Sequence, residues 1–196
     1  MTQLLNTSTD QRIVHHGRSW EQFKFIQKGF EGSPGVRLFY YNGTIEILMP
    51  GREHEIFKGI IGLLIEMFLY EKRVEFEQTG SMTQEEEGIA SAQADESYCI
   101  GASKPIPDLS IEVVFTSGGA AKLARYQALG VSEVWFWEDG LFALHRLRQH
   151  GYERIFRSEI PELIKLDIDL LTRCVLIAQT SRLQAIDEFR QGIQSG

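Results

Sequence analysis

The sequence predicts a mixed α/β (α+β) fold, in which helices flank a central mixed sheet. Three observations predict this class. Strand-like runs and amphipathic helical segments follow one another along the 196-residue chain, in the order helix, hairpin, helix, strands, helix, strand, hairpin, helix. Turn signals at Asn42-Gly43 and His150-Gly151 join neighbouring runs into hairpins. No repeat, linker or shift in composition divides the chain, so we expect one domain over residues 1–196.

The N-terminal half is expected to hold two helices around a hairpin. Residues 1–18 are polar and are expected to be loose. Ser19 is a suitable N-cap for a short helix over SWEQFKFIQKGF. The runs on either side of Asn42-Gly43 form the hairpin, and REHEIFKGIIGLLIEMFLYEK then has helical spacing. The apolar stripe of this helix consists of Ile56, Ile60, Leu63, Leu64, Met67 and Phe68.

The C-terminal part is expected to build most of the sheet. RVEFEQTGSMT is predicted as a strand and TQEEEGIAS as a polar loop. AQADESYCIG and IPDLSIEVVF follow as strands, GAAKLARYQALG as a helix that ends before Gly130, and VSEVWFWED as a further strand. FALHRLRQHGYERIF forms the second hairpin. Helical segments close the chain, with a helical extension over residues 178–196.

Composition limits the possible functions. The formal net charge of −7 argues against a broad basic surface that coats nucleic acid, but it is compatible with a nuclease whose metal ions neutralise an acidic site. Cys99 and Cys174 form no ligand cluster and are expected to be buried thiols in a reducing compartment. No apolar run reaches the ~20 residues of a membrane span, and MTQLLNTSTDQR has no hydrophobic signal core. We therefore expect a cytoplasmic protein with no membrane partner.

Two carboxylates interrupt the apolar strand in PIPDLSIEVVF. Side-chain alternation puts Asp108 and Glu112 on the same face, with their Cα atoms about 13 Å apart, which is long for sharing one ion. If the preceding strand pairs with this one around residues 101–106, Asp95 lies opposite Glu112, with Cβ atoms ~5 Å apart. Two like charges at that range repel, and a hard divalent cation turns the repulsion into attraction. We therefore predict that Asp95 and Glu112 hold a metal ion, with Asp108 either a site residue or a turn residue.

Lys122 is the nearby cation on the next element. FTSGGAA can bring the start of the following helix back over the acidic face. A lysine there would contact a scissile phosphate or orient a water molecule. The alternative is a surface lysine that balances the acidic residues.

The order PDLSIEV, Lys122, Tyr126 and GVSEVWFWEDG resembles the Uma-type putative restriction endonuclease family of bacteria, a branch of the PD-(D/E)XK nuclease superfamily. The hairpin NGTIEIL and the helix REHEIFKGIIGLL, with His54, also resemble that family, so the likeness covers residues 20–170 approximately. The resemblance implies a restriction endonuclease-like core and a DNA endonuclease that hydrolyses phosphodiester bonds with Mg²⁺ or Mn²⁺. It maps the family's acids to Asp95, Asp108 and Glu112 and its lysine to Lys122, and a metal-holding acid on the long helix to Glu55.

The sequence also departs from the family pattern. Val114 stands where the superfamily usually has a lysine, so Lys122 must take over that role. Ala94 replaces a proline that often precedes the first aspartate, and Val134-Trp135 replaces Tyr-Trp. These changes keep a second function open, namely a catalytically inactive protein that uses the nuclease fold for binding or assembly.

Three further features have two readings each. His54 either contacts the acidic residues of the site without binding the metal itself, or it has a structural role. The basic hairpin around His150-Gly151 either contacts phosphates or carries solubilising charge. Residues 134–137 are apolar on both strand faces, which indicates either sheet core or a dimer interface. From the second possibility we expect a symmetric homodimer.

Overall fold

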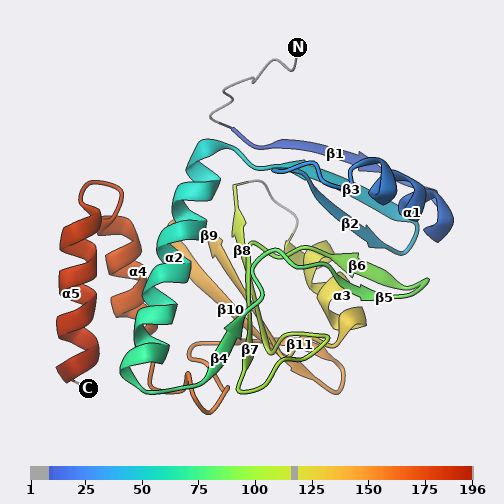
Figure 1. The fold of residues 1–196 in the computed structure, drawn as a ribbon. Coiled ribbons are helices and arrows are strands. Elements are labelled where there is room, and N and C mark those ends of the chain that lie inside the picture. Colours follow the sequence, from blue (N-terminus) through green and yellow to red (C-terminus); the bar gives the residue numbers. More distant parts are fainter. Residues whose placement is uncertain (1–8, 116–118, 196) are drawn as a thin grey trace.

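The computed structural model describes residues 9–115 and 119–195, which form five helices and two sheets (Figure 1). Sheet A has the strand order β1-β3-β2-β6-β5 and is antiparallel throughout. Its strands are β1 (Gln11–His15), β2 (Arg37–Tyr41), β3 (Thr44–Met49), β5 (Gln84–Glu86) and β6 (Ala90–Ala92). The mixed α+β class predicted from the element order is therefore confirmed.

Sheet B has the strand order β11-β10-β9-β8-β7-β4. Its strands are β4 (Phe76–Gln78), β7 (Glu96–Ile100), β8 (Leu109–Val114), β9 (Glu133–Glu138), β10 (Leu141–Arg148) and β11 (Gly151–Ile155). Only the β8–β9 pair among these described strands is parallel. Helix α3 (Gly119–Leu129) makes the crossover between those two strands, as parallel neighbours require.

The other helices are α1 (Trp20–Gly29), α2 (Arg52–Glu71), α4 (Ile168–Ile177) and α5 (Arg182–Ser195). Helix α2 covers one face of sheet B, with α4 and α5 packed beside it, and α3 covers the opposite face (Figure 1). Sheet A packs its Phe39 and Leu48 face toward α3 and its other face against α1. A polar side chain on the α3 face of sheet B therefore lies between the two sheets.

Strand β8 follows the predicted alternation. Leu109, Ile111 and Val113 join the core beneath α2, whereas Val114 joins the cluster beneath α3. Glu112 shares the parity of Val114 and so projects toward α3. This alternation places one carboxylate of the opening strand inside the layer between the sheets.

The turn and cap signals are also realised. Ser19 and Gln22 form the capping box of α1. Asn42 and Gly43 have φ values of 45° and 70° and link β2 to β3 as a tight hairpin. Gly130, with φ 77°, follows the last residue of α3.

Two expectations differ from the structure. TQEEEGIAS was expected as a loop, but it contains β5 and most of the β5–β6 hairpin. β5 is an edge strand whose glutamates remain accessible to solvent. Because an edge strand tolerates charged residues, the acidic run in this segment does not indicate a strand from sequence. Within the segment 1–18, expected to be loose, residues 11–15 form edge strand β1 on β3, while residues 1–8 lie outside the described part.

Strand β9 lies in the interior of sheet B. Val134, Trp135, Phe136 and Trp137 are all buried, and β8 and β10 flank the strand. Residues 134–137 are thus sheet core and offer no surface to a second copy. Within the described residues, no helix has the length and apolar character needed to cross a membrane.

Glu133, at the start of β9, is a completely buried carboxylate that anchors the segment before α4. It accepts hydrogen bonds from Trp135 Nε1 at 2.9 Å, Ser158 Oγ at 2.9 Å, and the backbone N–H groups of residues 159 and 160 at 2.7 and 3.1 Å. Arg146 Nη1 lies 3.4 Å away. These donors compensate the cost of burying the charge, so Glu133 has a structural role.

Candidate active site

The β7–β8 hairpin brings Asp95 and Glu112 together at the layer between the sheets. The two strands pair antiparallel, with Glu96 opposite Ile111, which confirms the predicted pairing. Beyond that pair the backbone N–H of Asp95 donates to the Ile111 carbonyl at 3.0 Å, so Asp95 lies beside the part of β8 that carries Glu112. Asp95 lies just before β7, where the chain passes from β6 of sheet A to sheet B. Both acids are 1% exposed.

Helix α3 supplies two donors to the Glu112 carboxylate. Lys122 Nζ lies 2.7 Å from Oε2, and the Tyr126 hydroxyl donates a short hydrogen bond to Oε1. The two donors are four residues apart and so lie on the same face of the helix. Burial raises the pKa of Glu112, but the charges of Lys122 and Arg125 and the two hydrogen bonds outweigh it, so the pKa lies below its usual value. Glu112 is therefore held as a carboxylate.

Asp95 has partners on three elements. Its Oδ2 accepts a hydrogen bond of 2.6 Å from the backbone N–H of Val113. Its Oδ1 lies 2.7 Å from His54 Nε2, at the start of α2, and forms an ion pair with Arg37 Nη1 of β2. The side chain of Asp95 thereby joins the two sheets to the first turn of α2.

His54 is fully buried between two carboxylates. Its Nδ1 lies 2.8 Å from Asp10 Oδ2, while its Nε2 faces Asp95. Burial lowers the pKa of His54, and although the hydrogen bond and charge of Asp10 raise it, the net pKa is below the usual value. The helix-start histidine thus reaches the predicted acidic site directly, and Asp10 orients its ring.

Arg37 connects Asp95 with Glu55. Its Nη1 contacts Asp95, and its Nη2 lies 2.8 Å from Glu55 Oε1. The Arg37 side chain is buried, whereas the Glu55 side chain is 50% exposed. Glu55 therefore stands at the rim of the site and is joined to Asp95 through Arg37.

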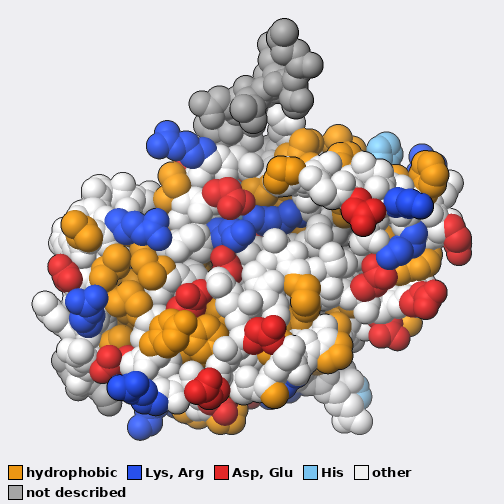
Figure 2. All heavy atoms as spheres, viewed as in Figure 1, with side chains coloured by type: hydrophobic (Ala, Val, Ile, Leu, Met, Phe, Trp, Pro, Cys, Tyr) orange, Lys and Arg blue, Asp and Glu red, His pale blue; other side chains and the backbone are white. Residues whose placement is uncertain are grey.

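A second set of ion pairs lies beside Glu112. Buried Glu46 of β3 is 2.7 Å from Arg12 Nε and 3.3 Å from Arg125 Nη1. The Arg125 guanidinium stacks over the Phe39 ring at 4.0 Å, and its Nε and Nη2 atoms have no hydrogen-bond partner among the described residues. Figure 2 shows acidic and basic side chains next to each other on the visible face, between α2 and sheet A.

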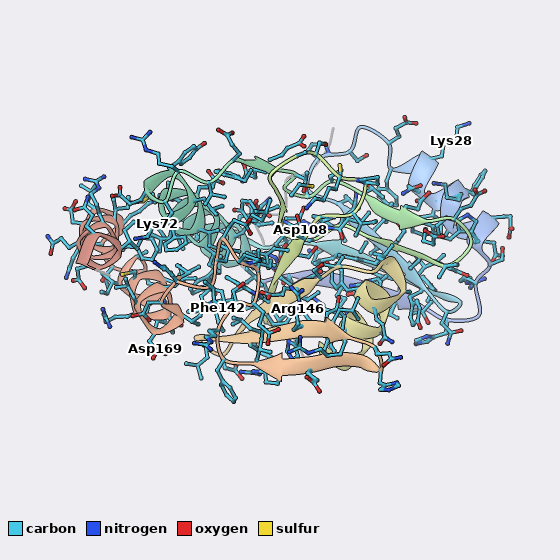
Figure 3. All side chains as sticks on the ribbon, turned by 90° about the horizontal axis from the view of Figure 1, so that it is seen from below. Lys28, Lys72, Asp108, Phe142, Arg146 and Asp169 are labelled. Atoms are coloured by element: carbon cyan, nitrogen blue, oxygen red, sulfur yellow. The ribbon has the colours of Figure 1, made fainter. Side chains whose placement is uncertain are left out.

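Asp108 has a different position from the other acids. Its Oδ2 accepts a 2.8 Å hydrogen bond from the backbone N–H of Ile100 and pairs with Lys104 Nζ at 2.5 Å. These partners lie at the end of β7 and in the β7–β8 connection, and Figure 3 labels Asp108 there. Of the two predicted readings, the structure favours the turn residue, because Asp108 is bound at the opposite end of β8 from Glu112.

Two arginines of the basic hairpin β10–β11 are paired with acids. Arg148 pairs with Glu153 and with both oxygens of Glu159, and Arg146 pairs with Glu133. These pairs favour the reading in which the hairpin carries structural and solubilising charge.

Several residues of the cluster were not predicted as site residues: Asp10, Arg12, Arg37, Glu46 and Arg125. Arg37 had a detectable signal, since it is a cation that opens the strongly apolar run VRLFYY. Tyr126 shares a face with Lys122 at a spacing of four. Asp10 and Glu46 had no such signal, because their partners are far away in the sequence.

The donors fit a hard divalent cation in their chemistry. Mg²⁺ typically takes one or two carboxylates and completes its coordination with water and substrate phosphates, and Asp95 and Glu112 are carboxylates of that kind. Among the residues described, no group of three or more His, Cys, Asp or Glu side chains is arranged to hold a metal ion. Any ion here would therefore depend on few protein ligands, and those ligands now pair with Arg37 and Lys122.

Comparison with protein families gives a match over most of the chain. The family model Uma2, described as a putative restriction endonuclease, matches residues 20–172. The matched region includes the four acids predicted from the sequence, Arg37, His54, Lys122 and the whole of sheet B, whereas Asp10 and Arg12 precede it. No curated protein matches the chain.

Proposed function

Because the chain belongs to the Uma2 family of putative restriction endonucleases, we propose that it is a DNA endonuclease that hydrolyses phosphodiester bonds with the help of Mg²⁺ or Mn²⁺. The observation that carries this proposal is that Lys122 pairs with buried Glu112 on β8, while buried Asp95 accepts a hydrogen bond from the backbone N–H of Val113, the next residue of the same strand. Two carboxylates and one ammonium are the groups that metal-assisted phosphodiester hydrolysis requires.

Each group has a proposed role. Asp95 and Glu112 would hold the divalent ion, which when bound would supply Lewis acidity to the reacting phosphodiester. Lys122 passes from Glu112 to a phosphate oxygen and stabilises the negative charge that develops there. Tyr126 keeps Glu112 in place by its hydrogen bond, and His54 orients Asp95. Asp108 is given no role, because it precedes β8 and pairs with Ile100 and Lys104 in the β7–β8 connection, away from Glu112.

A calorimetric titration tests the proposal. Mg²⁺ or Mn²⁺ should bind the parent protein, and Glu112→Gln should abolish that binding while the fold persists. The same variant should lose DNA cleavage. A parent protein that binds neither ion would overturn the metal-dependent function.

One observation favours the alternative, a catalytically inactive binding or assembly protein. The site's five carboxylates (Asp10, Glu46, Glu55, Asp95, Glu112) are ion-paired with five Arg or Lys side chains (Arg12, Arg37, Lys58, Lys122, Arg125) or with His54. With His54 neutral the cluster carries no formal net charge. Acids that are already paired with arginine and lysine side chains can be stable without a metal ion. The titration above therefore separates the two functions, because only the nuclease requires the parent protein to bind Mg²⁺ or Mn²⁺.

Two further parts of the proposal concern context. Both cysteines are free and buried, which agrees with a reducing compartment such as the cytoplasm. A homodimer remains a prediction without an assigned surface, because the strand that suggested it is sheet core. Sedimentation at micromolar concentration distinguishes a dimer from a monomer.

A further inference from the structure

Arg37 occupies the space between two of the predicted metal ligands. Its guanidinium contacts Asp95 through Nη1 and Glu55 through Nη2, the latter at 2.8 Å. The same Nη1 lies 3.3 Å from His54 Nε2. The forked guanidinium thus bridges a buried carboxylate and a rim carboxylate, a geometry that a lysine ammonium cannot reproduce.

A divalent ion and this guanidinium compete for the same oxygens. Arg37 Nη1 contacts Asp95 Oδ1, which also faces His54 Nε2, and a divalent ion bound by Asp95 would need the same oxygen. Two cations at contact distance in a buried layer repel strongly. Loading of Asp95 by a metal ion therefore requires Arg37 to leave that oxygen.

The charge balance of the cluster strengthens this competition. The carboxylates are already neutralised by the paired arginines and lysines, so the unloaded site has no excess negative charge to attract a divalent ion. Arg37 and the rim residue Lys58 each add one positive charge. Arg37 contacts buried Asp95 as well as Glu55, whereas Lys58 lies 3.8 Å from Glu55. Removing Arg37 alone leaves one uncompensated negative charge beside His54.

We propose that Arg37 is the resident cation of this site: it contacts the Asp95 oxygen that a divalent ion held by Asp95 and Glu112 would need, and so sets the metal concentration at which the site loads. This inference rests on the proposed metal-dependent function and deepens it. It gives the protein a built-in threshold, since the buried acids stay paired at low metal concentration and release Arg37 only when metal replaces it.

Calorimetric titration of Mn²⁺ into Arg37→Met tests the inference. The variant should bind Mn²⁺ about tenfold or more tightly than the parent, because the competing cation has gone. A tenfold change in affinity corresponds to about 1.4 kcal/mol of binding free energy. Arg37→Lys keeps the charge but not the bridge, so its affinity should lie between the two. It also serves as the test if Arg37→Met does not fold.

A thermal measurement gives a second readout without catalysis. Mn²⁺ should raise the melting temperature of Arg37→Met more than that of the parent, because the ion binds the folded state and replaces the lost cation. Arg146→Met is the matched control, since it removes an arginine from another buried acid, Glu133, outside the site. Mn²⁺ should not rescue this control.

The outcomes separate the inference from the proposed function. If the parent and Arg37→Met bind Mn²⁺ equally well and Asp95→Asn abolishes binding in both, the metal site stands and the role of Arg37 is wrong. If neither protein binds Mn²⁺, the metal-dependent function and the role of Arg37 both fall. Equal Mn²⁺ rescue of the Arg146→Met control would also overturn the role of Arg37.

Discussion

Lys122 Nζ lies 2.7 Å from Glu112 Oε2, and both side chains are buried although they lie on different elements. Glu112 points from β8 toward α3, and Lys122 lies near the start of α3, so the start of the helix lies over the strand that precedes it. The predicted lysine is thus directed at an acid and does not extend into solvent. This relationship underlies the role proposed for Lys122.

Lys122→Met should lower DNA cleavage by orders of magnitude, because the phosphate loses its cationic partner. The affinity for Mn²⁺ should stay similar or rise, since a competing cation has left Glu112. Cleavage assays and calorimetry on the same preparation check both results. Lys24→Met is the control, because Lys24 pairs with Glu85 at the edge of sheet A. A variant that cleaves as well as the parent would show that Lys122 is structural.

Tyr126→Phe should lower the affinity for Mn²⁺, because Glu112 loses the hydroxyl that fixes one of its oxygens. The free energy of unfolding should also fall by about 1–3 kcal/mol, since a buried acceptor loses its donor. Tyr152→Phe is a matched control that removes a 2.6 Å hydrogen bond to the Val131 carbonyl. The control should lose stability but keep its Mn²⁺ affinity, and an equal loss of affinity in both variants would contradict the specific role of Tyr126.

Glu46→Gln should destabilise the protein in a pH-dependent manner. Burial raises the pKa of Glu46, but the hydrogen bond from Arg12 and the charges of Arg125 and Lys122 outweigh it and bring the pKa below its usual value of 4.5. The ionised group therefore stabilises the fold above that pH, and this contribution disappears as the pH falls through the lowered pKa.

Urea unfolding at several pH values measures this effect. The variant should be about 1–3 kcal/mol less stable than the parent at pH 7, with a difference that shrinks below pH 4.5. A difference that stays constant with pH would mean that the charge of Glu46 does not stabilise the fold.

Glu133→Ala should lower the free energy of unfolding by about 3 kcal/mol or more, because several buried donors lose one shared acceptor. Glu153→Ala removes an exposed partner of Arg148 and should change stability by about 0.5 kcal/mol at most. Urea unfolding compares the two variants. Equal effects would show that Glu133 does not anchor the segment before α4.

The local signals in the sequence were sufficient for much of the fold. The Asn42-Gly43 turn, the Ser19 cap and the alternation around Glu112 each depend on neighbouring residues, and the structure confirms each of them. Strand β5 escaped prediction because an edge strand tolerates a run of charges, and β1 because a five-residue polar strand has little pattern.

The candidate site was predictable only where its residues lie on adjacent strands or consecutive elements. The position of Asp95 beside the strand that carries Glu112 follows from the predicted hairpin, and that of Lys122 from the helix after the strand. That the two carboxylates face each other stays a prediction. The contacts of Arg37 and Asp10 join β2, α2 and the chain before β1, and no short-range pattern records which distant residues will meet. Their roles became visible only through the packing of sheet A over α3.

Incubation of the parent protein with supercoiled plasmid DNA and Mn²⁺ tests the central claim most directly, with Glu112→Gln and a metal-free reaction run in parallel. The account predicts nicked or linear product from the parent in the presence of Mn²⁺, and none from Glu112→Gln or without metal. Intact plasmid in all three reactions, or equal cleavage by the parent and Glu112→Gln, would contradict it.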